Sequence, residues 1–484
     1  MEKNTITINK KIAMYEKEIE VSGDIIVPDI KPDIVNVIAS NGNAYIYKEE
    51  ISAEKVKVDG NLDSYIVYLA DNGETRSIGT TLNFFDNFDD SKITLDSFSK
   101  STVKIKAIES RALNERKISL KAILNICIEV YCKEEVQIGF DSNVLENVEY
   151  LKESVETKTL VGRSKVKTSV KEEIAIPEGY SASEILKVGI EVSKAENKIS
   201  YNKVLAKSEA NIKVLFLAED GRIGLAEASV PVMSFIDLEG VKEEQKIKIS
   251  YNIRNMVFKA NSSSISSQIE FEVGMEAYET RNLEIVQDMY GIKNDIEFSE
   301  KNIVIPVNSN DKDDQISINE RVLVEDILNI YDSEITFREV NRNNGIAECE
   351  VTIEFYYEAD SRNGLNYKKV QIPFNVRTRE NAKLKFQANR KKFTVSGEYV
   401  DCDLEILSKF ENMNYKEIKL IDNVNVRNEE NDEDYNMFIY FVKEKDTIWS
   451  IAKMFKVKVD ELIALNSIEN PNAIKVGDRI YVMR

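Results

Sequence analysis

A long alternation of apolar and polar residues is the feature that most constrains the fold of this chain. From Ile118 to Cys132 every even-numbered position is apolar, and most odd-numbered positions are polar or charged. A similar run extends from Ile269 to Ala277. Side chains of a β-strand point to opposite faces in turn, so such runs predict strands with one face on a core and one in water. The pattern indicates a mainly β protein.

The chain also resembles itself at a spacing of about one domain. The segment Lys104–Ala107 recurs at Lys246–Ile249 and Lys383–Phe386, with offsets of 246 − 104 = 142 and 383 − 246 = 137 residues. Each copy also contains a short apolar segment that we interpret as helix-like, and these are Asp33–Ile38, Glu184–Val188 and Asp326–Ile330. A repeat of this length predicts three related structural units.

Turn signals separate the strand-like runs. Asn72-Gly73 and Asp220-Gly221 lie between such runs, and pairs of this kind favour tight hairpins between antiparallel strands. We therefore expect three tandem antiparallel β repeats, each a β-sandwich or barrel-like. The expected boundaries are 1–148, 149–292 and 293–427, with the third copy the most divergent.

An acidic stretch separates the repeats from the C-terminus. Residues 428–434 contain five carboxylates in seven positions. A metal-binding loop is one interpretation, but the alternating ligands and the glycine of a calcium loop are missing. A solvated, self-repelling linker over 428–436 is the interpretation we adopt.

The composition limits the chemistry that the chain can perform. It has no histidine, which excludes Ser-His-Asp and Cys-His catalysis and histidine-ligated metals. Its four cysteines form no CxxC pair, and no glycine-rich phosphate loop occurs. Paired carboxylates could hydrolyse glycosides, but no pair among 84 acidic residues is distinguished. We expect no enzyme activity, no cofactor and no metal.

Charge and hydropathy limit the partners and the location. The formal net charge of −19 argues against nucleic acid as the main partner. The N-terminus has no apolar core typical of a signal peptide, and no run of 18 apolar residues occurs. We therefore expect a cytosolic protein that does not insert into membranes.

Residues 437–484 follow a different pattern, β-α-α-β. Ile448, Ile451, Ala452 and Phe455 form one apolar helical stripe, with Asp446 or Thr447 as its N-cap. A second short helix contains Val459, Leu462, Ile463 and Leu465 and stops at Asn466, and Arg479–Met483 is the closing strand.

This module closely resembles a LysM domain. The matching segments are Tyr440–Ala452, Val459–Asn466, Asn470-Pro471 and Ile474–Val482. Lys445 and Lys458 depart from the usual pattern, and each adds positive charge. LysM domains usually bind N-acetylglucosamine polymers in a groove. The resemblance places that groove between Asp446, Thr447 and Ile448 on one side and Asn470, Pro471, Asn472, Ala473 and Ile474 on the other. The same surface can dock a protein instead.

Two further side chains of the module are candidates for a partner contact. Residues 438–484 hold eight Lys or Arg and six Asp or Glu, so the module carries +2 and the rest of the chain −21. A basic module favours an acidic partner surface. Lys453 is placed to project beside the apolar stripe. Trp449, the only tryptophan, lies one residue off the stripe and is either a core residue or a binding anchor.

The N-terminal repeats resemble the SPOCS domain of spore-forming bacteria. The resemblance rests on Val21–Ile34 in the first copy, on Lys171–Pro177 in the second, and loosely on Ile305-Pro306 in the third. In the second copy Gly179-Tyr180 replaces the Lys-Pro of the family pattern. Tandem repeats of this kind followed by one LysM module look like the SipL family of spore coat morphogenetic proteins.

The family resemblance implies a function in sporulation. It implies a non-enzymatic scaffold for spore coat morphogenesis in the mother-cell cytoplasm, at the forespore surface. Its partner is then stage IV sporulation protein A, the coat ATPase, bound mainly through the LysM module, with other coat proteins or a second copy as possible further partners. The alternative is a LysM-mediated binder of peptidoglycan or chitin-like polymers, which should carry an export signal.

Overall fold

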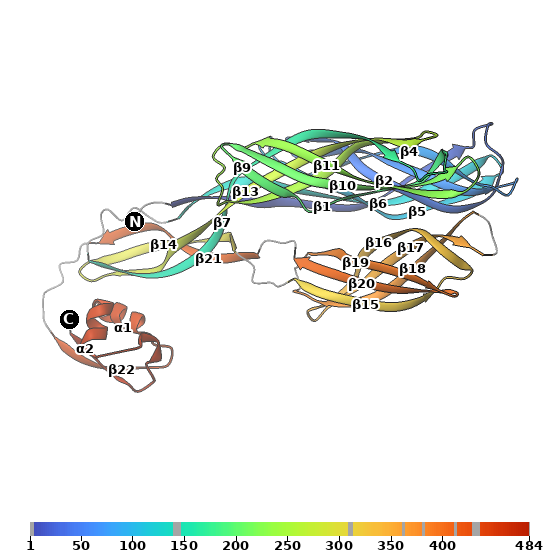
Figure 1. Cartoon of the computed structure of the whole chain (residues 1–484). Helices are drawn as coiled ribbons and strands as arrows, with labels where there is room; N and C mark the ends of the chain where they lie inside the picture. Colours follow the sequence, from blue (N-terminus) through green and yellow to red (C-terminus); the bar gives the residue numbers. More distant parts are fainter. Residues whose placement is uncertain are drawn as a thin grey trace.

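The protein is built almost entirely from antiparallel strands. The computed structural model describes residues 4–138, 147–307, 313–360, 364–379, 383–410, 414–427 and 436–483. Within these ranges α-helices occur only in the C-terminal module (Figure 1). The mainly β class is confirmed.

The first β domain is a sandwich of two three-stranded sheets. One sheet has the order β1(Asn4–Ile26), β6(Lys117–Ile138), β5(Phe98–Asn114), and the other β2(Ile34–Ser52), β3(Lys55–Ala70), β4(Thr75–Asp89). The pairing of β1 with β6 runs from Asn4 opposite Ile138 to Ile26 opposite Lys117. The first strand of the domain therefore lies beside the last.

The same strand order occurs twice more along the chain. The second sandwich places β7(Val148–Ala175), β13(Ser264–Gly291) and β12(Lys246–Ala260) against β8(Ala182–Val192), β10(Lys203–Ala218) and β11(Ile223–Asp237), with β9(Glu196–Ser200) on β10. The third places β15(Asp314–Leu323), β20(Tyr399–Phe410) and β19(Leu384–Ser396) against β16(Ile327–Asn343), β17(Ile346–Ala359) and β18(Leu365–Arg377). One backbone hydrogen bond recurs in all three, from the N–H of Asp71 to Asp33, of Glu219 to Ser181, and of Asp360 to Asp326.

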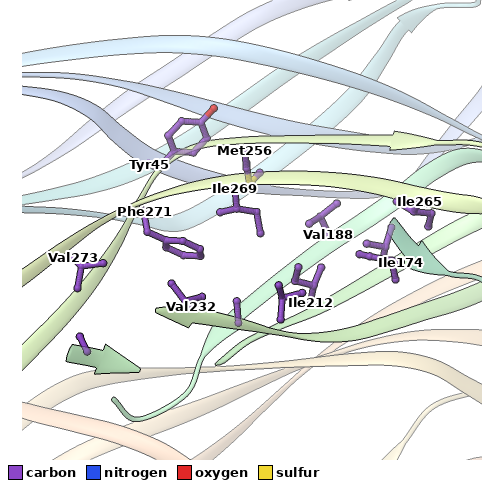
Figure 2. Packing of buried hydrophobic residues seen from close by; sticks show 14 of the residues in the cluster. Tyr45, Ile174, Val188, Ile212, Val232, Met256, Ile265, Ile269, Phe271 and Val273 are labelled. Atoms are coloured by element: carbon purple, nitrogen blue, oxygen red, sulfur yellow. The ribbon is translucent and has the colours of Figure 1, made fainter. Parts of the chain in front are cut away.

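The alternating runs are the central strands that the pattern predicts. In β6 the even-numbered residues from Ile118 to Val130 are all buried, while the odd-numbered ones face outward. In β13, Ile269, Phe271 and Val273 point into the second sandwich, where they meet side chains of the facing sheet (Figure 2). Each core is filled from the two inner faces of its sheets.

The two expected hairpin turns are present. Gly73 and Gly221 both have φ of +84°, which L-residues rarely adopt. Each donates its N–H to a carbonyl three residues back, Ala70 or Ala218, at 3.0 Å. These turns join β3 to β4 and β10 to β11.

The interpretation of three segments as helix-like is wrong. Asp33–Ile38, Glu184–Val188 and Asp326–Ile330 contribute to β2, β8 and β16. In β8, Val188 packs into the second sandwich, while Leu186 packs into a cluster shared with the other two domains. Because both faces of this strand are buried, its apolar residues Ile185, Leu186 and Val188 do not follow a period of two.

The sandwiches pack against one another around β8. Leu215 of the second domain, Val67 of the first and Tyr356 of the third share one apolar cluster. Asn41 donates its side-chain N–H to the carbonyl of Leu186 at 2.9 Å, which satisfies a backbone group of β8. The three sandwiches therefore form one packed body.

Residues 293–427 do not form one compact unit. The third sandwich begins at β15, while the flanking strands β14(Asp295–Val307) and β21(Asn414–Arg427) pair with each other and join the sheet of the second domain. Val307 lies opposite Thr157 of β7, whose hydroxyl donates to the carbonyl of Pro306 at 2.7 Å. The long ends of β7 and β13 extend beyond their own sandwich to make this sheet.

The C-terminal module lies beside this extended sheet. It contains β22(Met437–Phe441), α1(Ile448–Phe455), α2(Val459–Leu465), the 3₁₀ turn η1(Pro471–Ala473) and β23(Arg479–Met483). Figure 1 shows its helices toward β14 and β22 on the side away from it. Of the expected linker 428–436, residues 428–435 lie outside the described residues. No described helix is both long and apolar enough to cross a membrane.

Candidate partner-binding site

Helix α1 begins at a capping box. Thr447 has an extended backbone and accepts a hydrogen bond from the N–H of Ser450 at 3.0 Å, and its own N–H donates to the Ser450 hydroxyl at 2.9 Å. Both bonds satisfy donors that the first turn of a helix leaves open. Of the two expected N-cap residues, Thr447 is the cap.

Asp446 has a different task in the same loop. Its carboxylate accepts from the N–H of Lys443 at 2.7 Å and from the Tyr440 hydroxyl at 2.8 Å. The backbone N–H of Lys443, followed by the Tyr440 hydroxyl, lowers the pKa of Asp446. The carboxylate therefore stays charged and holds the loop that leads into α1.

The apolar stripe of α1 forms the core of the module. Ile448, Ile451 and Ala452 are buried, whereas Phe455 is half-buried and meets Tyr440 edge-on at 5.7 Å between ring centres. Ile448 was a candidate for the groove surface, but only 3% of it is exposed. It supports the expected groove from beneath, because the first turn of α1 packs inward.

The second half of the expected groove is an exposed turn. Asn470 accepts from the N–H of Asn472 at 3.0 Å and caps η1. Asn470, Pro471, Asn472 and Ala473 are exposed, and Ile474 is half-buried against the module core. Ile448 and Ile474 pack into the same core, so the fold brings both halves of the groove into one small module.

The two remaining candidates, Trp449 and Lys453, contact the protein's own β-sheet. Trp449 donates its indole N–H to one carboxylate oxygen of Asp288 at 2.8 Å, and the ammonium of Lys453 binds the other at 2.6 Å. Asp288 lies near the end of β13. Both side chains lie on one face of α1 because residues four apart are neighbours on a helix.

Tyr290 extends this contact into the core of the module. Its ring meets Trp449 at 5.0 Å and 63°, and its hydroxyl donates to the carbonyl of Val457 at 2.7 Å. Burial raises the pKa of Tyr290, so it remains a neutral donor. Lys456 makes a further ion pair with Asp295 of β14. The face of α1 expected to bind a partner is therefore docked on the body.

Sequence reasoning did not find Asp288, Tyr290 or Asp295. All three lie more than 150 residues from the side chains that they contact. The one available signal was the pairing of an aromatic and a basic residue at Trp449 and Lys453, which marks a contact face without naming the other side. Lys458 and its neighbour Glu461 form a local ion pair at 2.8 Å.

The most buried charges of the sandwiches are paired across domain contacts. The carboxylate of Glu276 forms an ion pair with the ammonium of Lys100 at 2.7 Å and accepts a hydrogen bond from the hydroxyl of Tyr278 at 3.1 Å. Lys187 binds Asp332 at 2.6 Å between the second and third domains. Among the described residues no cluster of three or more His, Cys, Asp or Glu could hold a metal ion. Glu276 and Asp332 are therefore members of structural ion pairs.

Comparison with known families assigns two parts of the chain. A LysM domain model matches residues 440–482, and a SipL, SPOCS domain model matches residues 181–261. The chain carries a SPOCS domain and a LysM domain. This agrees with the resemblance to the SipL family that the motifs indicate. No curated protein and no solved structure matches the chain.

The two matches fall on separate parts of the fold. The SPOCS match covers most of the second sandwich, from the start of β8 to the end of β12. The LysM match contains every candidate partner residue, from Asp446 to Ile474. The LysM domain thus presents exposed loops on one side, while its α1 face contacts the sheet next to the SPOCS domain.

Proposed function

We propose that this protein is a non-enzymatic scaffold for spore coat assembly that docks stage IV sporulation protein A, the coat ATPase, mainly through its LysM domain. The observation that carries the proposal is the presence of a SipL, SPOCS domain and a LysM domain in one chain. Both are binding domains, and they indicate a protein of sporulation. A scaffold needs separate docking faces rather than a reaction centre.

The arrangement of the sandwiches supports this proposal. The second sandwich carries the SPOCS match, and the first and third repeat its strand order. We infer that all three are SPOCS-type repeats that supply further contacts, to other coat proteins or to a second copy. The proposed place of action is the forespore surface, on the side of the mother-cell cytoplasm.

Binding of the purified ATPase tests the proposal. The full chain should bind stage IV sporulation protein A, and a chain lacking residues 436–484 should lose most of that affinity. Circular dichroism of the shortened chain must show an intact β body. Equal binding by both chains would place the contact on the β repeats, and no binding by the full chain would refute the proposed partner.

Glycan binding is the second candidate function. It is favoured by the exposure of Thr447 and of the turn Asn470–Ala473, which are the groove residues that the LysM resemblance implies. Co-sedimentation with insoluble peptidoglycan and chitin tests it. Asn472→Ala should then reduce the bound fraction, while Asp460→Ala, an exposed change on α2, should not.

A further inference from the structure

The outer face of the two-stranded sheet in the LysM domain is apolar. Five of its six side chains are large and apolar, and each is between 40% and 64% exposed: Met437, Ile439, Phe441, Tyr481 and Met483. The sixth is Arg479, which lies opposite Phe441. The inner face, with Ile480 and Val482, already covers the domain core. A sheet with one solvated face usually carries polar residues there, so this face suits a partner.

One edge of this sheet is closed by a side chain. The amide of Asn466 donates to the carbonyl of Tyr481 at 2.7 Å, and its oxygen accepts from the N–H of Tyr481 at 2.7 Å. The side chain thus takes the place of a neighbouring strand along β23.

The opposite edge, along β22, is open. The sheet has two strands in the described structure, so nothing described pairs with the far side of β22. The backbone N–H of Val442 donates to the carbonyl of Asp478, and the carbonyl of Val442 accepts from the N–H of Gly477. Along an antiparallel strand, residues whose backbone hydrogen-bonds to the partner strand alternate with residues whose backbone points away from it. The backbone of Tyr440 is therefore directed toward β23, and the N–H and C=O of Ile439 point to the open edge. This agrees with Tyr481, the residue opposite Ile439, whose backbone groups also point away from its partner strand.

The orientation of the LysM domain leaves this surface accessible. Trp449 and Lys453 hold α1 against β13, and β22 lies on the side away from the body (Figure 1). The contact with the body therefore uses one face of the domain and leaves the sheet face uncovered.

The charge of the surface specifies the partner. The guanidinium of Arg479 lies 5.9 Å from the centre of the Phe441 ring, and no carboxylate of the described chain forms an ion pair with it. Lys443 lies next to the same strand, 5.8 Å from the ring centre of Tyr440. A carboxylate on the incoming segment can pair with Arg479. A second copy would bring Arg479 toward Arg479, and both chains carry a net charge of −19.

We propose that an extended protein segment adds to the open edge of β22 as a third strand, with apolar side chains and one carboxylate on the face that it shares with Ile439, Tyr481 and Arg479. Its backbone binds the N–H and C=O of Ile439, its apolar side chains cover Ile439 and Tyr481, and its carboxylate, placed beside Phe441, approaches Arg479. Strand addition of this kind takes affinity from main-chain bonds and specificity from alternate side chains. The proposal rests on the proposed function only in taking the LysM domain as the part that binds a partner.

Two probes test this surface on the full chain. The first is the capped peptide Val-Thr-Val-Thr-Val-Thr-Glu, whose Val and Glu side chains share one face of a strand, with Lys in place of Glu as its control. The second is purified stage IV sporulation protein A. The Glu peptide should bind and the Lys peptide should not, and backbone amides of β22 should gain protection from hydrogen exchange.

Single substitutions separate the edge from the face. Ile439→Pro removes the outward N–H, and proline is tolerated where the N–H of an edge strand faces away from its neighbour. Ile439→Glu and Tyr481→Glu add negative charge to exposed positions. Each of these three substitutions should weaken the binding of both probes at least about tenfold. Val476→Glu and Met454→Glu change equally exposed apolar residues outside the sheet face and should leave binding unchanged. Thermal melting must show that the glutamate variants remain folded.

The outcomes distinguish this inference from the proposed function. If the ATPase binds all variants equally and the Glu peptide does not bind, the surface is wrong and the proposed function stands. If the peptide binds at β22 but the ATPase does not bind the chain, the surface is right and the proposed partner is wrong. If neither probe binds, or if Ile439→Glu converts a dimer into a monomer in sedimentation, the proposed occupant is wrong.

Discussion

The second sandwich makes two very different contacts with its neighbours. It meets the third sandwich through buried groups, where Lys187 is 4% exposed and Leu215 packs with Tyr356. It meets the LysM domain at the far end of β13, where the ion pair between Lys453 and Asp288 is partly in water. A buried charge must keep its partner, whereas a partly solvated pair contributes little to stability. The sandwiches are therefore held as one body, and the LysM domain is held by a contact that can open.

The largest expected effect is on the contact between the sandwiches. Asp332→Ala leaves the ammonium of Lys187 buried beside only one carboxylate, Glu334, and should cost about 3–5 kcal/mol. Chemical denaturation measures it. Lys369→Ala, which removes a more exposed ion pair with Glu354, is the matched control and should cost less than about 1 kcal/mol. Equal costs would mean that the interface is not the rigid contact described above.

The same ion pair has a defined pH dependence. Burial lowers the pKa of Lys187, but Glu334 and Asp332 outweigh burial and raise the pKa overall. When the pKa of a lysine is higher in the folded protein than in the unfolded chain, its ion pair stabilises the fold. This stabilisation is complete at pH values below the unfolded pKa of about 10.4 and is lost as the pH rises through the folded pKa. Thermal melting at pH 7 and 9 should show the same cost for Asp332→Ala, and the cost should decrease only above about pH 10.5.

The next effect should be confined to the LysM domain. Ile451 is fully buried in its core, so Ile451→Ala should destabilise the domain by about 2–5 kcal/mol and leave the sandwich transition unchanged. Calorimetry of the full chain separates the two transitions. Met454→Ala on the exposed side of the same helix serves as the control. A single transition that moves as a whole would show that the LysM domain and the body unfold together.

A smaller effect is expected at the contact between the LysM domain and the body. Asp288→Ala removes the carboxylate that Trp449 and Lys453 share and should weaken docking by about 1–3 kcal/mol. Trp449 is the only tryptophan, so its fluorescence reports on this contact, and its emission should shift to the red. Lys453→Glu should do the same, because it sets two carboxylates side by side. Glu284→Ala on the same strand should not change the emission; an unchanged spectrum for Asp288→Ala would refute the contact.

The smallest effect is expected from Lys456. Its ion pair with Asp295 is partly exposed on both sides, so Lys456→Gln should weaken docking by at most about 1 kcal/mol. The effect should decrease further in 0.5 M salt, because screening acts on exposed charges. A titration of the Trp449 emission with denaturant at two salt concentrations measures it. An effect as large as that of Asp288→Ala would show that charge, rather than the Tyr290 and Trp449 packing, holds the domain.

Local patterns of the sequence predicted much of the fold. The strand at Ile118–Val130, the turns at Gly73 and Gly221, and the cap at Thr447 all follow from residues close together in the chain. The LysM domain and its β-α-α-β order were predicted because its helices, loops and strands lie within 48 residues and carry a specific motif. Each of these features depends on periodicity, backbone conformation or capping, which neighbours in sequence determine.

The errors and omissions have one physical cause. Glu184–Val188 seemed helix-like because β8 is covered on both faces by different domains, which no local pattern reveals. The apolar groups on the outer face of β22 were not distinguished from core residues for the same reason. An apolar residue in the sequence indicates that its side chain favours burial, but it does not indicate which element of the fold buries it.

By itself, the sequence determined the central strands β6 and β13, two of the hairpin turns, the acidic character of the body and the LysM domain at its end. Only the tertiary structure decided that β14 and β21 join the sheet of the second sandwich rather than the third. Only the tertiary structure decided that Trp449 contacts Asp288, a residue 161 positions earlier in the chain. Hydrogen bonds within a turn or helix form between near neighbours, so their residues record them. Contacts between distant strands depend on how whole domains pack, and many different residues can satisfy that packing equally well.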